Sequence, residues 1–200
     1  MIGFVLAKMP GLVLSVSATT RAQRPGEQHG REYFFLERDD FRRWVADGKF
    51  LEWAEYAGNL YGTPALAVQY NLAAGLDVVL EIELKGAEQI LRMRPDAVMI
   101  YIMPPSLEEL ERRLRGRKTD SEEAIRSRLI RAREEMAVVA SKAQRGLPPL
   151  HYVIVNDRIK RAGGELAVII KRIREEDEQT DSRRDTFRTL RRPGRGSGGA

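Results

Sequence analysis

The chain has 200 residues, of which 42% are hydrophobic and only 7% aromatic, a composition that predicts one folded domain with a single core. It contains no cysteine, so disulfides, thiolate metal sites and a cysteine nucleophile are excluded. Its two histidines, His29 and His151, lie far apart in the sequence and argue against a histidine metal site. No apolar run approaches the roughly 18 residues of a membrane-spanning helix, and we expect a soluble, cytoplasmic protein that contacts no membrane.

The net charge of +5 is concentrated near the C-terminal end. Six arginines and a single aspartate between residues 183 and 195 account for all of it, and the rest of the chain is close to neutral. Residues 174–200 are charged and end in a run rich in glycine and arginine, which is typical of a disordered tail. Weak contact of this tail with RNA is an alternative, but no specific nucleic-acid binding is expected.

The first half of the chain predicts one buried strand followed by a small β-rich unit. Residues 12–16 are apolar and β-branched between turn residues, which indicates a buried strand. Residues 31–36 and 50–56 carry aromatic and β-prone side chains and are predicted to be strands. Between these two segments, Asp39 or Asp40 can cap a helix with an apolar face.

The second half alternates predicted helices and strands, which is the pattern of a parallel sheet. Buried strands are expected at residues 77–82, 98–103 and 152–155. The predicted helices before, between and after them lie at residues 66–74, 88–93, 107–114 and 121–142 and around residues 166–170. A capping box that begins at Ser106 opens the helix after the second of these strands.

Residues 15–35 place hydroxyls, arginines and a tyrosine close together just after the first strand. A guanidinium group binds phosphate oxygens in a fork and a phenol adds one further donor, so this segment suits a ligand that carries a phosphate. Read together with residues 50–56 and 58–64, the segment resembles the part of guanylate kinases that binds the nucleoside monophosphate.

The resemblance extends from Pro10 to about Ile173, which is most of the chain. It implies an α/β fold of the P-loop kinase type, in which helices flank a parallel sheet. Residues 1–173 would form the guanylate kinase-like domain, with a GMP-binding β subdomain at about residues 17–64 and a helical lid at about residues 113–128.

The activity that this resemblance implies is the transfer of a phosphoryl group from ATP to GMP with Mg²⁺, giving ADP and GDP. Guanine donates hydrogen bonds from N1 and from its 2-amino group, whereas adenine has an acceptor at N1, so one carboxylate can discriminate between them. Glu52 is the candidate for this carboxylate. The other residues that match the base and phosphate contacts of GMP are Ser17, Thr63, Arg21, Arg24, Tyr33 and Tyr61.

The resemblance also assigns residues to the ATP side of the reaction. The catalytic candidates are the lid arginines Arg113, Arg117 and Arg128, for which helical surface ion pairs are the alternative explanation. Glu81 and Glu83 match acids near the phosphates of the substrate and the water shell of Mg²⁺, and a buried ion pair is the alternative for one of them. Asn156 and Asp157 match the loop beside the adenine of ATP. No side chain is assigned as a direct metal ligand.

The chain departs from the family pattern on the ATP side. The 200 residues contain no Walker A sequence, G-x-x-x-x-G-K-[ST], which supplies the amides and the lysine that hold ATP phosphates. The strand before that loop is also missing, which predicts a gap in the middle of the parallel sheet. A misplaced start, a truncation or a natural loss would explain the departure, and we expect this polypeptide by itself to have little or no kinase activity.

The alternative function is a non-catalytic module that binds GMP or a phosphorylated peptide in the same cup. A peptide binder needs neither a carboxylate that reads guanine nor lid arginines, and this chain has candidates for both. The sequence predicts no oligomeric state.

Overall fold

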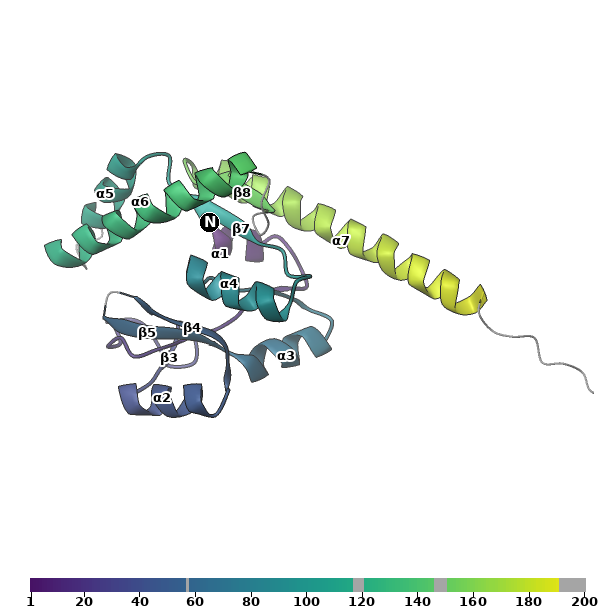
Figure 1. The fold of residues 1–200 in the computed structure, drawn as a ribbon, viewed down its shortest axis with the longest axis horizontal. Helices are drawn as coiled ribbons and strands as arrows, with labels where there is room; N and C mark the ends of the chain where they lie inside the picture. Colours follow the sequence, from purple (N-terminus) through teal and green to yellow (C-terminus); the bar gives the residue numbers. More distant parts are fainter. Residues whose placement is uncertain (57, 117–120, 146–150, 191–200) are drawn as a thin grey trace, which may run out of the picture.

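The computed structural model of the protein describes residues 1–56, 58–116, 121–145 and 151–190. Strands and helices alternate along the second half of these residues, and a small β-rich unit occupies much of the first half (Figure 1). The predicted α/β class is therefore confirmed. In the described part of the chain, no helix is both long enough and apolar enough to cross a membrane.

Four parallel strands outside the small β-rich unit form two separate pairs. β1 (Leu12–Leu14) pairs with β6 (Asp77–Val79), and β7 (Ile100–Met103) pairs with β8 (Tyr152–Val155). All four strands lie where the sequence predicts them, but β1, β6 and β7 are shorter than predicted. No ladder joins the two pairs within the described residues.

A mixed sheet of four strands lies between β1 and β6 along the chain, with the spatial order β3-β2-β5-β4. β2 pairs in parallel with β3 and antiparallel with β5, and β5 pairs antiparallel with β4. The strands are β2 (Ala18–Thr19), β3 (Phe34–Phe35), β4 (Phe50–Tyr56) and β5 (Asn59–Pro64). We call these four strands the acceptor unit; they occupy the region expected to bind GMP.

Helix α2 (Arg38–Ala46) packs on the acceptor unit through Phe41. The Phe41 side chain is completely buried and stacks on Phe50 of β4, with 4.5 Å between ring centroids. The predicted N-terminal cap of this helix is wrong, because Asp39 and Asp40 lie in its first turn and not before it. Acids in the first turn still stabilise a helix through its dipole.

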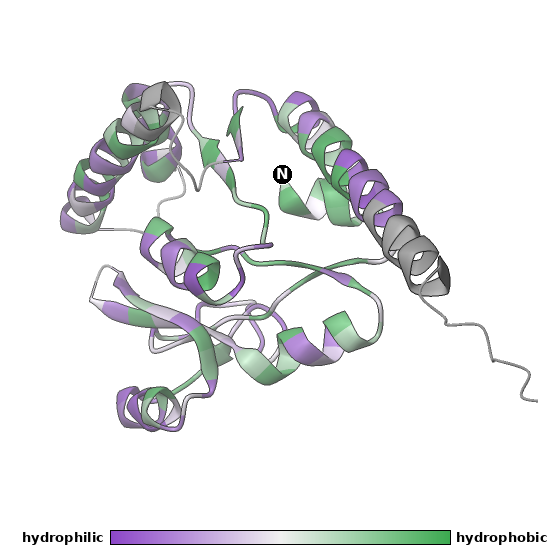
Figure 2. Cartoon of the chain, turned by 45° about the vertical axis from the view of Figure 1, so that its right-hand side comes forward, coloured by the Kyte–Doolittle hydropathy of each residue, from purple (hydrophilic) through white to green (hydrophobic). Residues whose placement is uncertain are grey.

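Helices α1 (Ile2–Leu6) and α7 (Ile159–Leu190) pack against each other and cover the strands β1 and β8 (Figure 2). Gly163 permits this close contact, because a Cβ atom there would lie 2.6 Å from Cδ1 of Phe4. The core beneath these helices includes Val5, Leu12 and Ile154.

The remaining helices are α3 (Ala65–Ala73), α4 (Leu84–Met93), α5 (Leu107–Gly116) and α6 (Glu122–Arg145). Figures 1 and 2 both place α4 between the acceptor unit and α6. One of the two hydrogen bonds of the capping box predicted at Ser106 is present: the Ser106 Oγ accepts a 3.2 Å hydrogen bond from the Glu109 N–H. Because it lies between the acceptor unit and α6, helix α4 contacts the region expected to bind GMP and faces the region expected to form the lid.

Helix α7 continues to Leu190, into residues 174–200, for which the sequence predicts a disordered tail. No glycine or proline occurs between residues 165 and 192, and pairs such as Arg172 with Glu176, whose Nε and Oε1 lie 2.8 Å apart, support the helix. Charge composition alone suggested disorder, but alternating charges at helical spacing favour a solvated helix. Residues 191–200 lie outside the described part.

Candidate active site

A β-bulge in β4 brings a buried carboxylate against a buried hydroxyl. The register of β4 against β5 shifts between Phe50 and Glu52, so Glu52 stands opposite Thr63, where Leu51 would stand in a regular ladder. The Thr63 hydroxyl donates a 2.6 Å hydrogen bond to Oε1 of Glu52. Glu52 is only 5% exposed, and this burial raises the pKa of its carboxyl, while the hydrogen bonds from Thr63 oppose the shift.

Arg21 and Arg24 lie in the loop after β2, and Glu27 organises this loop. Nη2 of Arg21 lies 2.8 Å from Oε1 of Glu27, and the backbone N–H of Arg24 donates a 2.8 Å bond to Oε2. The bond from Arg21 is the main reason that the pKa of Glu27 is lowered. A guanidinium has five N–H donors, so Arg21 keeps donors for an anionic ligand.

Tyr33 and Tyr61 lie side by side next to this loop, with 6.1 Å between their ring centroids. The Arg21 guanidinium lies over the Tyr33 ring, 5.4 Å from its centroid. Burial raises the pKa of Tyr33, and the charges of Tyr61 and Glu81 add to the shift. Ser17 precedes β2, and its carbonyl accepts a 2.9 Å bond from the Phe34 N–H. Seven of the residues predicted to bind GMP, all except Glu81 and Glu83, are thus on or beside the acceptor unit.

Glu81 and Glu83 lie between β6 and α4. Glu81 is exposed, whereas Glu83 lies 3.7 Å from Arg131 of α6 and hydrogen-bonds Glu135 of the same helix. Burial, and next the charge of Glu83, raise the pKa of Glu135 to about 7. Glu83 thus forms an ion pair with Arg131, but this pair is only half-buried, whereas the alternative considered for one of the two acids is a buried pair.

A cavity of about 300 Å³ opens beside α6. We call it the donor cavity, because four residues predicted for the reacting phosphates and ATP line it: Glu83, Arg113, Arg128 and Asn156. Apolar side chains of β7 and α5, including Ile102 and Leu110, complete part of its wall. Residues from segments far apart in the sequence thus line one cavity.

Arg113 connects α5 to the loop after β8. Its Nη1 donates a 2.8 Å hydrogen bond to the carbonyl of Asn156, and its Nη2 donates a 3.2 Å bond to the carbonyl of Asp157. The carboxylate of Asp157 is itself engaged, since Oδ1 lies 2.6 Å from Nε of Arg161. Hydrogen bonds from Arg161 and from the Arg158 N–H lower the pKa of Asp157.

The other two predicted lid arginines are Arg128 and Arg117. Arg128 belongs to α6, lines the donor cavity and lies over the ring of Tyr56, 5.4 Å from its centroid. Arg131, one turn further along, lies 4.5 Å from the same centroid. Arg117 lies outside the described residues.

Sequence reasoning missed Glu27 and Glu135, which contact the predicted residues. Glu27 follows Arg24 by three residues in a turn, a spacing that could have indicated a local carboxylate–arginine contact. Glu135 carries no such signal, because its contacts with Glu83 and Tyr101 depend on how α6 packs against segments more than thirty residues away.

The two groups of residues suit the two ends of a phosphoryl transfer. The buried Glu52 can accept paired N–H donors of a base, and the arginine loop with its tyrosines can bind a phosphate. The arginines of the donor cavity can stabilise negative charge that develops between two phosphates.

Comparisons with known proteins agree with this chemistry. The family model described as guanylate kinase matches residues 5–173. The guanylate kinase of Rubrobacter xylanophilus is 53% identical over 168 residues, which cover 84% of each chain. That of Trichodesmium erythraeum is 48% identical over 86% of this chain and 88% of its own length. The crystal structure of guanylate kinase from Anaplasma phagocytophilum matches with a TM-score of 0.68 at 34% identity, covering 85% of this chain and 78% of that one. The chain therefore belongs to the guanylate kinase family.

Proposed function

We propose that the protein is a guanylate kinase that transfers the γ-phosphoryl group of ATP to GMP and gives ADP and GDP. The observation that carries this proposal is the buried pair of Glu52 and Thr63 on the same sheet as the Arg21 loop. A cytoplasmic location, where both nucleotides are available, belongs to the same proposal.

Glu52 reads the base in this proposal. Its carboxylate accepts the N1–H and the 2-amino group of guanine, and the Thr63 hydroxyl holds Oε1 in place. Adenine has an acceptor at N1 and no proton there to donate. Its N1 would therefore face the carboxylate without a hydrogen bond, and buried polar groups would be left unpaired. Ser17 completes the base contacts from the strand beside it.

Arg21, Arg24, Tyr33 and Tyr61 hold the phosphate of GMP. Two guanidinium groups and two phenols supply enough donors for the phosphate oxygens that do not react. Glu27 keeps the arginine loop in position, and its contact with Arg21 is the one that a bound phosphate would share or replace.

In the transfer step, one oxygen of the GMP phosphate attacks the γ-phosphorus of ATP. The bond between that phosphorus and the oxygen bridging to the β-phosphate breaks, and its electron pair leaves with ADP. Charge spreads over the oxygens of the transferred group, and Arg113, Arg117 and Arg128 are the cations that we assign to it.

The acidic segment before α4 fits a hydrated Mg²⁺ ion. Mg²⁺ commonly binds through waters, substrate phosphates and one or two carboxylates, and Glu81 offers an exposed carboxylate on this segment. Within the described residues, no group of three or more histidine, cysteine, aspartate or glutamate side chains could hold a metal ion. When bound, Mg²⁺ neutralises phosphate charge.

The experiment that tests the function measures ADP formation from ATP and Mg²⁺ with GMP, with AMP or with no acceptor. It compares the 200-residue chain with a version extended at its N-terminus by a strand and a Walker A segment. We expect GMP-dependent turnover by the extended version to exceed that of the chain by at least about three orders of magnitude, because phosphate-binding cations act on that scale. The proposed function would be contradicted if AMP supported ADP formation as well as GMP does, or if ADP formed at the same rate with and without an acceptor.

A further inference from the structure

The Gln89 side chain of helix α4 hydrogen-bonds the edge strand of the acceptor unit. β4 is the last strand of the order β3-β2-β5-β4, so one side of its backbone has no partner strand. The Gln89 amide supplies the missing partners: its Nε2 donates a 2.9 Å bond to the Trp53 carbonyl, and its Oε1 accepts a 3.3 Å bond from the Trp53 N–H. This paired contact fixes the position of α4 against the residue next to Glu52.

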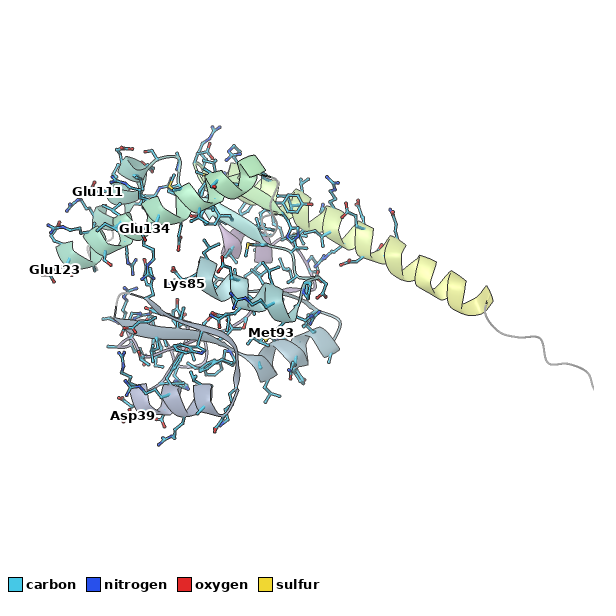
Figure 3. All side chains as sticks on the ribbon, in the orientation of Figure 1. Asp39, Lys85, Met93, Glu111, Glu123 and Glu134 are labelled. Atoms are coloured by element: carbon cyan, nitrogen blue, oxygen red, sulfur yellow. The ribbon has the colours of Figure 1, made fainter. Side chains whose placement is uncertain are left out.

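Gly86 lies one turn before Gln89 and faces the carboxylate of Glu52. A Cβ atom at residue 86 would lie 3.0 Å from Cδ of Glu52 and closer still to Oε2, nearer than real Cβ atoms approach other atoms. Figure 3 shows α4 over β4, with Lys85 and Met93 marking its two ends. The Glu52 carboxylate is therefore held on one side by the Thr63 hydroxyl and on the other by the bare backbone of α4.

The backbone conformation does not explain why residue 86 is glycine. Its φ angle lies outside the left-handed region, in contrast to Gly75 or Gly48, and it is buried inside a helix. A glycine inside a helix is less favourable than an alanine, because it loses more conformational freedom on folding. The space that Glu52 occupies is the feature of the structure that requires the absence of a side chain.

We propose that Gly86 is a specificity-determining positioning residue, because the absence of a side chain there leaves room for Glu52 in the orientation that reads guanine. Gln89 holds α4 so close to β4 that a side chain at residue 86 would not fit beside Glu52. The inference rests on the proposed role of Glu52 and extends it to a residue that touches no substrate. Adding one methyl group at residue 86 would push the carboxylate away from Thr63 and from the base.

The first test compares Gly86→Ala with Gly164→Ala by calorimetric titration with GMP, guanosine and AMP. Gly164 is a matched control, because it is also helical and a Cβ atom there would have nothing within 4 Å. We expect Gly86→Ala to weaken binding of GMP and of guanosine alike by about tenfold or more, the factor for one lost hydrogen bond to a charged group. AMP affinity should not fall, and Gly164→Ala should change none of the three. An unchanged preference for GMP over AMP in Gly86→Ala would overturn the inference.

The second test adds Glu52→Ala, alone and combined with Gly86→Ala. If Gly86 acts through Glu52, the double variant binds GMP as Glu52→Ala does, and it unfolds at a higher temperature than Gly86→Ala because the clash is gone. Losses that simply add would mean that Gly86 supports the fold and not the carboxylate, which would overturn the inference. Failure of the proposed function would give a different result, because the wild-type chain would then bind GMP and AMP equally. The unfolding temperatures of the variants would still report the contact between residues 52 and 86.

Discussion

A buried carboxylate is costly for a protein unless partners satisfy it, and Thr63 is the hydrogen-bond partner of Glu52. One oxygen accepts the Thr63 hydroxyl, and the side chain is 5% exposed. Burial therefore favours the protonated form and raises the pKa of Glu52. Two N–H donors from guanine would favour the ionised form, so binding of the base and ionisation of Glu52 are linked.

This linkage predicts that guanosine affinity depends on pH. Because only the ionised carboxylate accepts both guanine donors, affinity should be highest above the raised pKa of Glu52 and fall as the pH drops through it. Guanosine is the better probe than GMP, since a phosphate monoester titrates near pH 6 itself. Dissociation constants measured between about pH 5 and about pH 8 test this, a range in which guanosine has no titrating group of its own. The Glu52→Ala variant should show a flat profile, and a flat profile for the wild-type chain would disprove the linkage.

The proposed roles of Arg21 and Arg24 predict a second selectivity, for a nucleotide, which carries a phosphate, over a nucleoside, which does not. Each Arg→Ala variant should weaken GMP binding by about 10- to 100-fold, the value of a charge-assisted hydrogen bond. Guanosine binding should hardly change, because it lacks the phosphate. Arg31→Ala is the matched control, since Arg31 is a neighbouring arginine that pairs with Glu32 and is 56% exposed. Equal losses for GMP and guanosine would mean that the arginines only support the fold.

Among the elements, β4 has the largest influence on the site. Its limits, Phe50–Tyr56, are those that the sequence predicts, because aromatic and β-prone residues fill it. Its bulge could not be predicted, because it depends on contacts with distant residues. Gly62 of β5 is one of them: a Cβ atom there would lie 3.0 Å from the carbonyl oxygen of Glu52 and 3.1 Å from Cζ of Phe41.

Helix α6 carries an acid whose pKa gives a test of its packing. Glu135 has an ordinary pKa of 4.5, which burial and the charge of Glu83 raise to about 7. Between these two values the folded chain binds more protons than the unfolded chain, so stability falls as the pH rises. Glu135→Gln removes the ionisation, and it should raise the unfolding temperature relative to the wild type at about pH 8 but not at about pH 4.

The exposed neighbour Glu134 provides the control for this measurement. Glu134→Gln should shift the unfolding temperature little at either pH, because surface charges contribute little to stability. An offset for Glu135→Gln that is the same at both pH values would show that its carboxyl is not held in the neutral form by burial and by the charge of Glu83.

At the scale of the molecule, α4 and α6 connect the acceptor unit with the donor cavity. Gln89 of α4 binds the edge of β4, and two arginines of α6 lie over Tyr56 at its end. Glu83 and Arg131 join the two helices through their ion pair. A movement of α6 would therefore reach the strand that carries Glu52.

The sequence predicted the class of the fold and most elements, because local patterns of apolar residues decide them. It also named residues that gather in two places, since the order of the motifs along the chain resembles that of a known family. It could not predict contacts between distant segments, such as Gly86 with Glu52 or Glu83 with Glu135. For residues 174–190 its composition predicts a disordered tail, whereas the spacing of charges there also suits a helix, and α7 continues to Leu190.

The central claim is that Glu52 makes this chain select guanine, and the most direct measurement is calorimetric titration of the wild-type chain and of Glu52→Ala with GMP and with AMP. The wild-type chain should bind GMP in clear preference to AMP. Glu52→Ala should lose about 2–4 kcal/mol of GMP binding, because the guanine donors are left unpaired, and its AMP binding should not weaken. Equal affinity of the wild-type chain for GMP and AMP, or a Glu52→Ala variant that keeps the preference for GMP, would contradict the account.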